Sequence, residues 1–346
     1  MNENNSNMNR RQMLKYLGTG TLFMGAGGII GKVNTFARTE SFLTQRTTVS
    51  ISKGNDCRDI TFQALMQIED EIMTSLEGKK RILVKPNMVH TSKPLCATSV
   101  ESIKGILDFL KPRWKGPVVV GESTAHQDGT WAGFKNYGYL PLEKEYGITL
   151  KDLNEGPHIM RYAIGTGNAP LPVPILTTFL DRDQYIISAA KMKTHDRVLA
   201  TLSLKNILLA APWNQYKNMN FKRHMHQTQD RSRDSILHYN MFSLAQEIYP
   251  DLGVIDGFEA MEGNGPVGGT PVDMRVAMAS TDPLALDTVA MKSMGFDPSQ
   301  ILYLTSLGES GMGAHTMEKI QVKGYSLDKF NYHFKASDRM ERIYGI

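Results

Sequence analysis

Three residues that can carry positive charge follow one apolar run in the sequence. The run 185–190 leads directly into Lys191, Lys193 and His195, and the pair Lys205-Asn206 comes ten residues later. Alternate residues of a strand share a face, so the first three side chains would stand in a row about 6.6 Å apart. Cations this close disfavour one another's charged forms unless an anion lies among them. The spacing therefore predicts a pocket for a carboxylate or a phosphate.

The same residues could take part in catalysis. A lysine crowded by other cations has a lowered pKa and can act as a base or a nucleophile, and a histidine can move protons near neutral pH. We therefore name Lys193, His195 and Lys205 as candidate catalytic residues. The alternative is a buried network in which these cations only pair with acids. We favour a functional role, because taking several charges out of water for stability alone carries a large desolvation penalty.

Three other apolar runs also end in polar residues. Val84 is followed by Lys85-Pro-Asn87, Val120 by Gly-Glu122-Ser123, and Ile255 by Asp256-Gly-Phe-Glu259. In open parallel sheets, ligands bind beyond the carboxyl ends of the strands. We therefore expect these residues to meet at one edge of a sheet. The expected ligand-binding residues are Lys85, Asn87, Glu122, Ser123, Lys191 and Asn206, together with Gly263, Gly265 and Gly268.

The three glycines belong to the stretch DGFEAMEGNGPVGGTP at 256–271. Glycines allow close backbone approach and exposed amides, as in loops that bind anions. The stretch is not a P-loop, because no Gly-Lys-Ser/Thr follows, and it does not fit the dinucleotide fingerprint. A glycine-rich surface turn is the alternative interpretation.

Acidic residues in and near this stretch could hold a divalent metal. Hard cations prefer oxygen ligands, and Asp256, Glu259 and Glu262 are the candidates. No tight metal-binding motif such as H-E-x-x-H occurs, so the presence and identity of a metal stay open. The RHMH sequence at 223–226 is interpreted as part of a solvated lid rather than as a metal site.

Strand-like and helix-like segments alternate along the chain from about residue 46. This order predicts an α/β fold with a mostly parallel twisted sheet covered by helices on both faces, in a single domain spanning 46–346. Residues 154–174 are expected to be a long loop with one short strand near Tyr162, and 212–234 an excursion or lid. Strands are expected at 47–52, 81–84, 117–120, 148–153, 184–191, 252–255 and 274–279, and helices at 56–76, 98–110, 130–139, 200–210, 234–248 and 284–294.

The N-terminus has the composition of an export signal. Arg10-Arg11-Gln-Met-Leu-Lys15 precedes a glycine-rich apolar stretch at 16–31 and a small-residue cleavage site at 35–37. Paired arginines followed by Leu-Lys resemble the twin-arginine signal, which implies passage through the twin-arginine export machinery into the periplasm of a bacterium. Residues 1–37 are therefore expected to be a signal peptide. The alternatives are a basic leader or an uncleaved anchor, but the apolar stretch is short for a stable membrane span.

Composition excludes some partners and cofactors. The 346 residues carry a net charge of only +4, which does not indicate a nucleic-acid partner. Cys57 and Cys96 are the two cysteines, so a cysteine-ligated iron–sulfur cluster or a four-thiolate zinc site is not expected. They could form one disulfide or remain inert thiols.

Five stretches together resemble the domain of unknown function 362 family. They are ILVKPNMV (82–89), VVVGESTA (118–125), IISAAKMKTHDRVLATLSLKN (186–206), VIDGFEAMEGNGPVGG (254–269) and STDPLALDTVAM (280–291). The resemblance implies an α/β fold but no established reaction. Some members carry ferredoxin-type clusters, whose cysteines this chain lacks. The Lys-x-Lys-x-His and Leu-Lys-Asn pattern is also similar to that of lactate-racemase-like proteins, which bind anionic substrates with lysines and histidines.

Together these features predict an exported enzyme that acts on a small anionic substrate by proton transfer or isomerisation next to a carboxylate. The alternative is a non-catalytic periplasmic binding protein for an anionic or metal-containing ligand. Electron transfer is disfavoured by the cysteine count.

Overall fold

The computed structural model describes residues 46–215, 219–226 and 235–346. Residues 46–346 form one compact unit. The expected signal peptide at 1–37 and parts of the expected lid at 212–234 lie outside the described residues.

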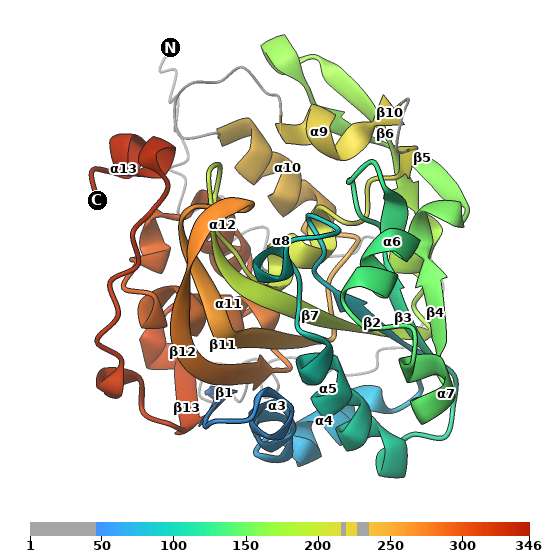
Figure 1. The fold of residues 1–346 in the computed structure, drawn as a ribbon. Helices are drawn as coiled ribbons and strands as arrows, with labels where there is room; N and C mark the ends of the chain where they lie inside the picture. Colours follow the sequence, from blue (N-terminus) through green and yellow to red (C-terminus); the bar gives the residue numbers. More distant parts are fainter. Residues whose placement is uncertain (1–45, 216–218, 227–234) are drawn as a thin grey trace, which may run out of the picture. The chain divides into compact units, whose positions relative to one another are not determined.

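A sheet of nine strands runs through this unit in the order β13-β1-β12-β11-β7-β2-β3-β4, with β8 paired to β7 (Figure 1). The five strands β11, β7, β2, β3 and β4 run parallel to one another. β12 is antiparallel to both β11 and β1, and β1 is parallel to β13. The prediction of a mostly parallel sheet is confirmed. The strands are β1 (Thr47–Lys53), β2 (Arg81–Pro86), β3 (Val118–Glu122), β4 (Thr149–Asp152), β7 (Gln184–His195), β8 (Leu199–Thr201), β11 (Leu252–Asn264), β12 (Gly268–Ser280) and β13 (Ile320–Gly324).

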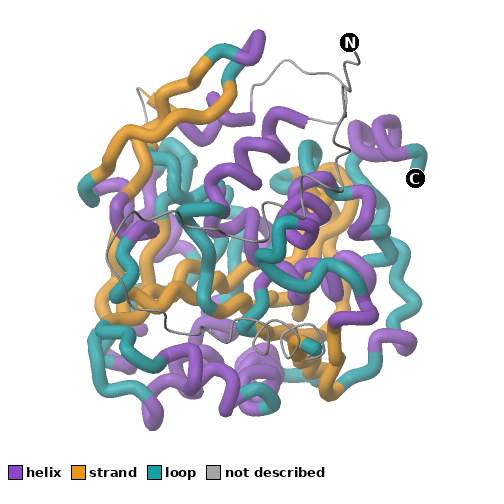
Figure 2. The backbone as a smooth tube through the Cα atoms, turned by 180° about the vertical axis from the view of Figure 1, so that it is seen from behind, coloured by secondary structure: helices purple, strands orange, loops and turns teal. Residues whose placement is uncertain are grey.

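Helices cover both faces of the sheet (Figure 2). Alternate residues of a strand point to opposite faces and so enter two separate hydrophobic cores. In β2, Leu83 faces one core, whereas Ile82 and Val84 face the other. The core at Leu83 packs against α8 (Ser203–Leu208), α10 (Ser235–Ala245), α11 (Pro283–Ser293), α12 (Leu302–Glu309) and α13 (Asp338–Tyr344). The core at Ile82 packs against α3 (Cys57–Met66), α4 (Glu69–Leu76), α5 (Val100–Arg113), α6 (Gly129–Asn136) and α7 (Leu142–Tyr146).

The segment at 154–174 contains the short strand expected near Tyr162, but a second strand, which was not expected, pairs with it to form a hairpin. β5 (His158–Ile164) pairs antiparallel with β6 (Pro170–Leu176). Prolines at 170, 172 and 174 make β6 look like a loop in the sequence, because proline has no N–H for a strand ladder. Their spacing of two residues places every missing N–H on the same edge of the strand, so the other edge can still pair with β5.

The glycine-rich stretch is also strand rather than loop. β11 extends to Asn264 and β12 begins at Gly268, so the two strands form a long hairpin with a tight turn. At Gly265, an added Cβ would lie 2.1 Å from the Thr194 carbonyl oxygen. This glycine is therefore required for close packing of the turn against the end of β7.

Candidate functional site

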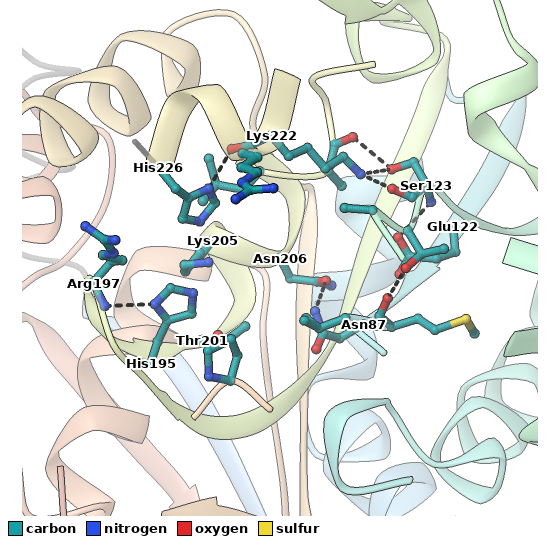
Figure 3. Close-up of a pocket in the computed structure, with 18 of the residues that line it drawn as sticks. Asn87, Glu122, Ser123, His195, Arg197, Thr201, Lys205, Asn206, Lys222 and His226 are labelled. Carbon is teal, nitrogen blue, oxygen red and sulfur yellow. Dashed lines mark hydrogen bonds between the residues drawn. The ribbon is translucent and has the colours of Figure 1, made fainter. Parts of the chain in front are cut away.

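The ends of β2, β3 and β7 surround a pocket of about 520 Å³ together with α8 and the short helix α9 (Phe221–His226). This volume is in the range of sites for small molecules. The pocket lies beyond the carboxyl ends of parallel strands, where ligands bind in open α/β sheets. The predicted residues that line it are Lys85, Asn87, Glu122, Ser123, His195, Lys205 and Asn206 (Figure 3).

One side of the pocket is a buried polar cluster whose charges compensate one another. Lys85 Nζ lies 3.0 Å from Glu122 Oε2 and donates to Asn206 Oδ1 at 2.8 Å. Asn87 Nδ2 donates to the same amide oxygen at 3.0 Å. Burial lowers the pKa of Lys85, and the Glu122 carboxylate opposes this shift. The cluster therefore ties β2, β3 and α8 together, and Lys85 does not need a ligand to balance its charge.

Lys205 differs from Lys85 because its side chain lacks such a partner. It projects from α8, is only 7% exposed and lines the pocket. Among the described residues, none makes a hydrogen bond or an ion pair with its Nζ. Burial is the main cause that lowers the pKa of Lys205 to about 7; Asp196 opposes this shift and Lys85 adds to it. The pocket therefore contains a buried amine whose charge is not compensated by contact with an acid.

Asp287 holds the helix that carries Lys205. This buried carboxylate on α11 accepts hydrogen bonds from the backbone N–H groups of Ser203 at 2.8 Å and Leu204 at 3.0 Å. These groups at the start of α8 have no partner within the helix. Asp287 is not among the predicted site residues, and its role is to position α8.

Two imidazole rings lie beside Lys205 (Figure 3). His195, at the end of β7, stacks on His226 of α9 with ring centroids 5.8 Å apart. Burial, Lys205 and further cations lower the pKa of His195 well below its usual value and that of His226 to about 3. Both rings are therefore neutral near pH 7.

The hydrogen bonds of the two rings assign different tautomers. The Arg197 backbone N–H donates to His195 Nδ1 at 3.0 Å, so the neutral ring carries its proton on Nε2. Asp196 Oδ1 lies 3.3 Å from the same nitrogen, but burial beside Lys205 disfavours a charged His195. His226 Nδ1 lies 2.6 Å from the Lys222 carbonyl oxygen and must donate to it, which leaves Nε2 with a lone pair. The pair thus offers one N–H donor and one nitrogen acceptor.

α9 supplies residues that the sequence analysis did not place in the site. Lys222 is buried, and its Nζ donates to Ser123 Oγ at 2.9 Å and to the Ser123 carbonyl oxygen. The interpretation of 223–226 as solvated is correct for Arg223 and His224 but wrong for His226, which lines the pocket. Lys222 and His226 are four residues apart and so share one helix face. This spacing is the sequence signal that could have identified both as pocket residues.

Lys191 and Lys193 do not line the pocket. Lys191 Nζ lies 3.1 Å from Asp256 Oδ2 in a buried ion pair. Lys193 donates to the Cys96 carbonyl oxygen at 3.1 Å, and burial lowers its pKa to about 7. Both side chains are buried and lie outside the pocket lining. Of the three residues expected to form a row of cations, only His195 lines the pocket. Lys193 still acts on the site, because its charge contributes to the lowered pKa of His195.

The glycines and the candidate metal ligands also lie elsewhere. Gly263, Gly265 and Gly268 form the end of the β11–β12 hairpin, from which Pro266 alone lines the pocket. Glu259 is exposed, and Glu262 accepts a hydrogen bond from the Lys335 backbone N–H. Asp256 is paired with Lys191, so the three acids do not converge. Within the described ranges, no group of three or more histidine, cysteine or acidic side chains could hold a metal ion. Cys57 and Cys96 are free and buried.

Comparison with known proteins places this fold and pocket in a family. Residues 82–292 match the family described as a domain of unknown function, DUF362. The chain belongs to the DUF362 family. All of the pocket residues named above lie inside the matched region, so the pocket is part of the DUF362 domain itself.

One relative of this DUF362 chain is a thylakoid-associated protein from Synechocystis sp. It is 28% identical over 240 residues, which cover 69% of this chain and 70% of the relative. A solved structure of a protein from Thermotoga maritima matches with a TM-score of 0.33 and 12% identity, over 63% of this chain and 55% of that protein. Among the described helices of the DUF362 chain, none has the length and apolar character needed to cross a membrane.

Proposed function

We propose that this protein is an enzyme that carries out proton-transfer or isomerase-type chemistry on a small anionic substrate in the pocket. The observation that supports this most directly is the buried, uncompensated Lys205 beside two neutral imidazoles. An unpaired charge away from water is costly, so a site of this kind favours binding of an anion. The substrate's carboxylate or phosphate meets the Lys205 ammonium.

Two further atoms support a substrate with additional polar groups. Asn87 Oδ1 and Thr201 Oγ1 are buried, line the pocket and have no hydrogen-bond partner among the described residues. Buried polar atoms are nearly always paired in folded proteins. A hydroxyl or amine on the substrate would donate to Asn87 Oδ1, and Thr201 would bond a second substrate oxygen.

The two histidines then divide the proton transfer. His226 Nε2 has a lone pair and removes a proton from the substrate, while the His195 Nε2–H donates one. General acid–base catalysis by such a pair contributes about 10²–10⁴-fold. In this proposal Lys205 and His195 are catalytic, and His226 joins them. Lys193 acts through its charge on His195 rather than by contact with the substrate.

A non-catalytic binding protein is the second candidate. A base with a pKa of about 3, as for His226, is weak at neutral pH, and this favours a role limited to hydrogen bonding. A bound anion would raise the pKa values of both imidazoles. An enzyme needs this increase, because it makes His226 a stronger base, whereas a binding protein does not depend on it.

We further propose that the protein is exported to the bacterial periplasm. The Arg10-Arg11 motif and the apolar stretch behind it support this location. The thylakoid association of the Synechocystis relative is consistent with a protein that works at or beyond a membrane.

The enzyme and the binding protein differ in how variants behave. Short carboxylic acids and inorganic phosphate would be titrated by calorimetry, and exchange of carbon-bound protons would be followed by NMR in D₂O. Lys205→Met should weaken anion affinity by about one to two decades, since a charge-assisted contact contributes about 1.5–3 kcal/mol. His195→Gln and His226→Gln should keep most of the affinity but lower exchange by about 10²–10⁴-fold.

Equal, modest losses of affinity in all three variants, with no exchange by the parent protein, would decide for the binding protein. Lys191→Met with Asp256→Leu is the control, because it removes a nearby buried charge pair that does not line the pocket.

A further inference from the structure

We propose that Lys205 forms a Schiff base with the carbonyl carbon of a short oxo acid in this pocket. The inference rests on the proposed function, since it assumes that the pocket binds a small anion. The Schiff base goes beyond the proposed function because it names the substrate class and makes Lys205 a nucleophile.

Comparison of the lysines around the pocket singles out Lys205. Lys85 is paired with Glu122, and Lys222 donates to two oxygen atoms of Ser123. Lys193 donates to a backbone carbonyl and does not line the pocket. A nucleophilic amine needs a free lone pair and access to the ligand, and Lys205 meets both conditions.

The surroundings of Lys205 favour its neutral form. Its pKa of about 7 leaves a large fraction of the amine unprotonated at neutral pH, whereas an ordinary lysine at this pH is almost fully charged. Burial and neighbouring cations are the recognised means of activating a lysine for attack on a carbonyl.

The two imidazoles provide the proton transfers that imine formation needs. The Lys205 nitrogen attacks the carbonyl carbon, the C=O π pair moves to oxygen, and that oxygen takes the proton of His195 Nε2. His226 Nε2 accepts the proton lost by nitrogen. The carbinolamine hydroxyl then takes the proton held by His226, its C–O bond breaks, and the nitrogen lone pair forms the C=N bond as water leaves. One proton taken up from solvent restores His195. A neutral amine, a ketone and one proton thus give an iminium ion and one water molecule, without an oxidant or reductant.

The carboxylate of the oxo acid first meets the Lys205 ammonium, and it needs another partner once the lysine nitrogen becomes part of the imine. Lys222 uses two of its three N–H groups on Ser123, which leaves one for the substrate. Thr201 Oγ1 is buried in the lining, and no described residue forms a hydrogen bond with it. The iminium then makes the adjacent C–H acidic, and this connects the Schiff base with the proton transfer proposed above.

Borohydride reduction tests the proposal. The full-length protein would be incubated with pyruvate, acetoacetate or 2-oxoglutarate, reduced with sodium borohydride, and measured by intact mass and peptide mapping. At least one oxo acid should add its own mass less one oxygen atom, at Lys205. Lactate and succinate, which lack a ketone, should add nothing. Labelling should increase as the pH rises through about 7, following the unprotonated amine.

Matched variants make the result specific. Lys205→Arg and Lys205→Met should form no adduct, whereas the double variant Lys191→Met with Asp256→Leu should keep it, because that buried pair does not line the pocket. Circular dichroism of each variant checks that it is folded. An adduct at Lys193, labelling spread over surface lysines, or no adduct with an oxo acid that calorimetry shows to bind would overturn the Schiff base.

The outcomes also separate this inference from the proposed function. If anions bind in a Lys205-dependent way but no adduct forms, the anion site stands and the Schiff base is rejected. If no carboxylate or phosphate binds the parent protein at all, both proposals fail.

Discussion

At the scale of single residues, two buried lysines in this protein have opposite relations to their surroundings. Lys191 is matched by an acid at 3.1 Å, whereas Lys205 faces the pocket without an acid in contact. Both side chains are buried, so burial alone does not distinguish the two lysines. The difference lies in the partner, and it predicts different responses to pH and to mutation.

Binding of an anion that lacks a ketone, such as inorganic phosphate, should be linked to proton uptake at Lys205. The pKa of the free lysine is about 7, and a bound anion raises it, so the protein takes up a proton on binding just above this pH. Affinity is then full below pH 7 and falls by up to about tenfold per pH unit above it. Calorimetry in two buffers with different ionisation enthalpies measures the uptake.

Lys205→Arg is the control for this linkage, because arginine stays charged throughout the range. It should remove most of the pH dependence. An unchanged proton uptake in Lys205→Arg would assign the linkage to another group, such as Lys222, whose pKa is also about 7.

The Lys191–Asp256 pair should matter for stability and not for binding. Asp256→Ala leaves a buried ammonium without its partner, which typically costs about 3–5 kcal/mol. The double variant Lys191→Met with Asp256→Leu should recover only part of this loss. Apolar residues of similar size can replace a buried ion pair, but the backbone N–H groups of Ser99 and Phe258 lose the carboxylate that accepts from them. Urea denaturation measures both. Loss of anion affinity in the folded double variant would instead place the pair in the site.

At the scale of elements, the position of α8 depends on one carboxylate from another helix. Asp287→Ala would leave the backbone N–H groups of Ser203 and Leu204 buried and unpaired, at about 1–3 kcal/mol each. Because Lys205 follows directly in α8, anion affinity should fall together with stability. Denaturation and calorimetry on the same variant measure the two effects.

Asp56→Ala is the matched control for Asp287→Ala. Asp56 caps α3 by accepting from the Asp59 N–H, and losing such a cap costs about 1 kcal/mol. α3 does not contribute to the pocket lining, so affinity should be unchanged. If Asp287→Ala binds anions as well as Asp56→Ala does, Asp287 has no positioning role.

At the scale of the whole molecule, the N-terminal arginines should determine location. Arg10→Lys with Arg11→Lys should keep the protein in the cytoplasm, because the twin-arginine machinery reads the arginine pair. Fractionation of a bacterial host and immunoblotting give the distribution, with Arg38→Lys as a control just beyond the expected cleavage site. Normal periplasmic recovery of the double variant would contradict the proposed export.

The sequence by itself determined the local features of the protein. Short apolar runs ending in Lys85, Glu122 and His195 identified parallel strands and the edge at which their polar residues meet. The helix expected at 284–294 is α11, and the structure shows Asp282 capping its start. These features depend on neighbours along the chain, and so a single sequence contains them.

Only the tertiary structure decided which of these polar residues has a partner. Lys191 pairs with Asp256 across 65 positions of sequence, whereas Lys205 makes no hydrogen bond or ion pair with an acid within the part of the chain that the structure describes. His226 enters the pocket on a helix whose polar sequence looks solvated. The physical reason is that burial and pairing depend on distances between residues far apart in the chain, and alternation along a strand specifies a face but not what packs against it.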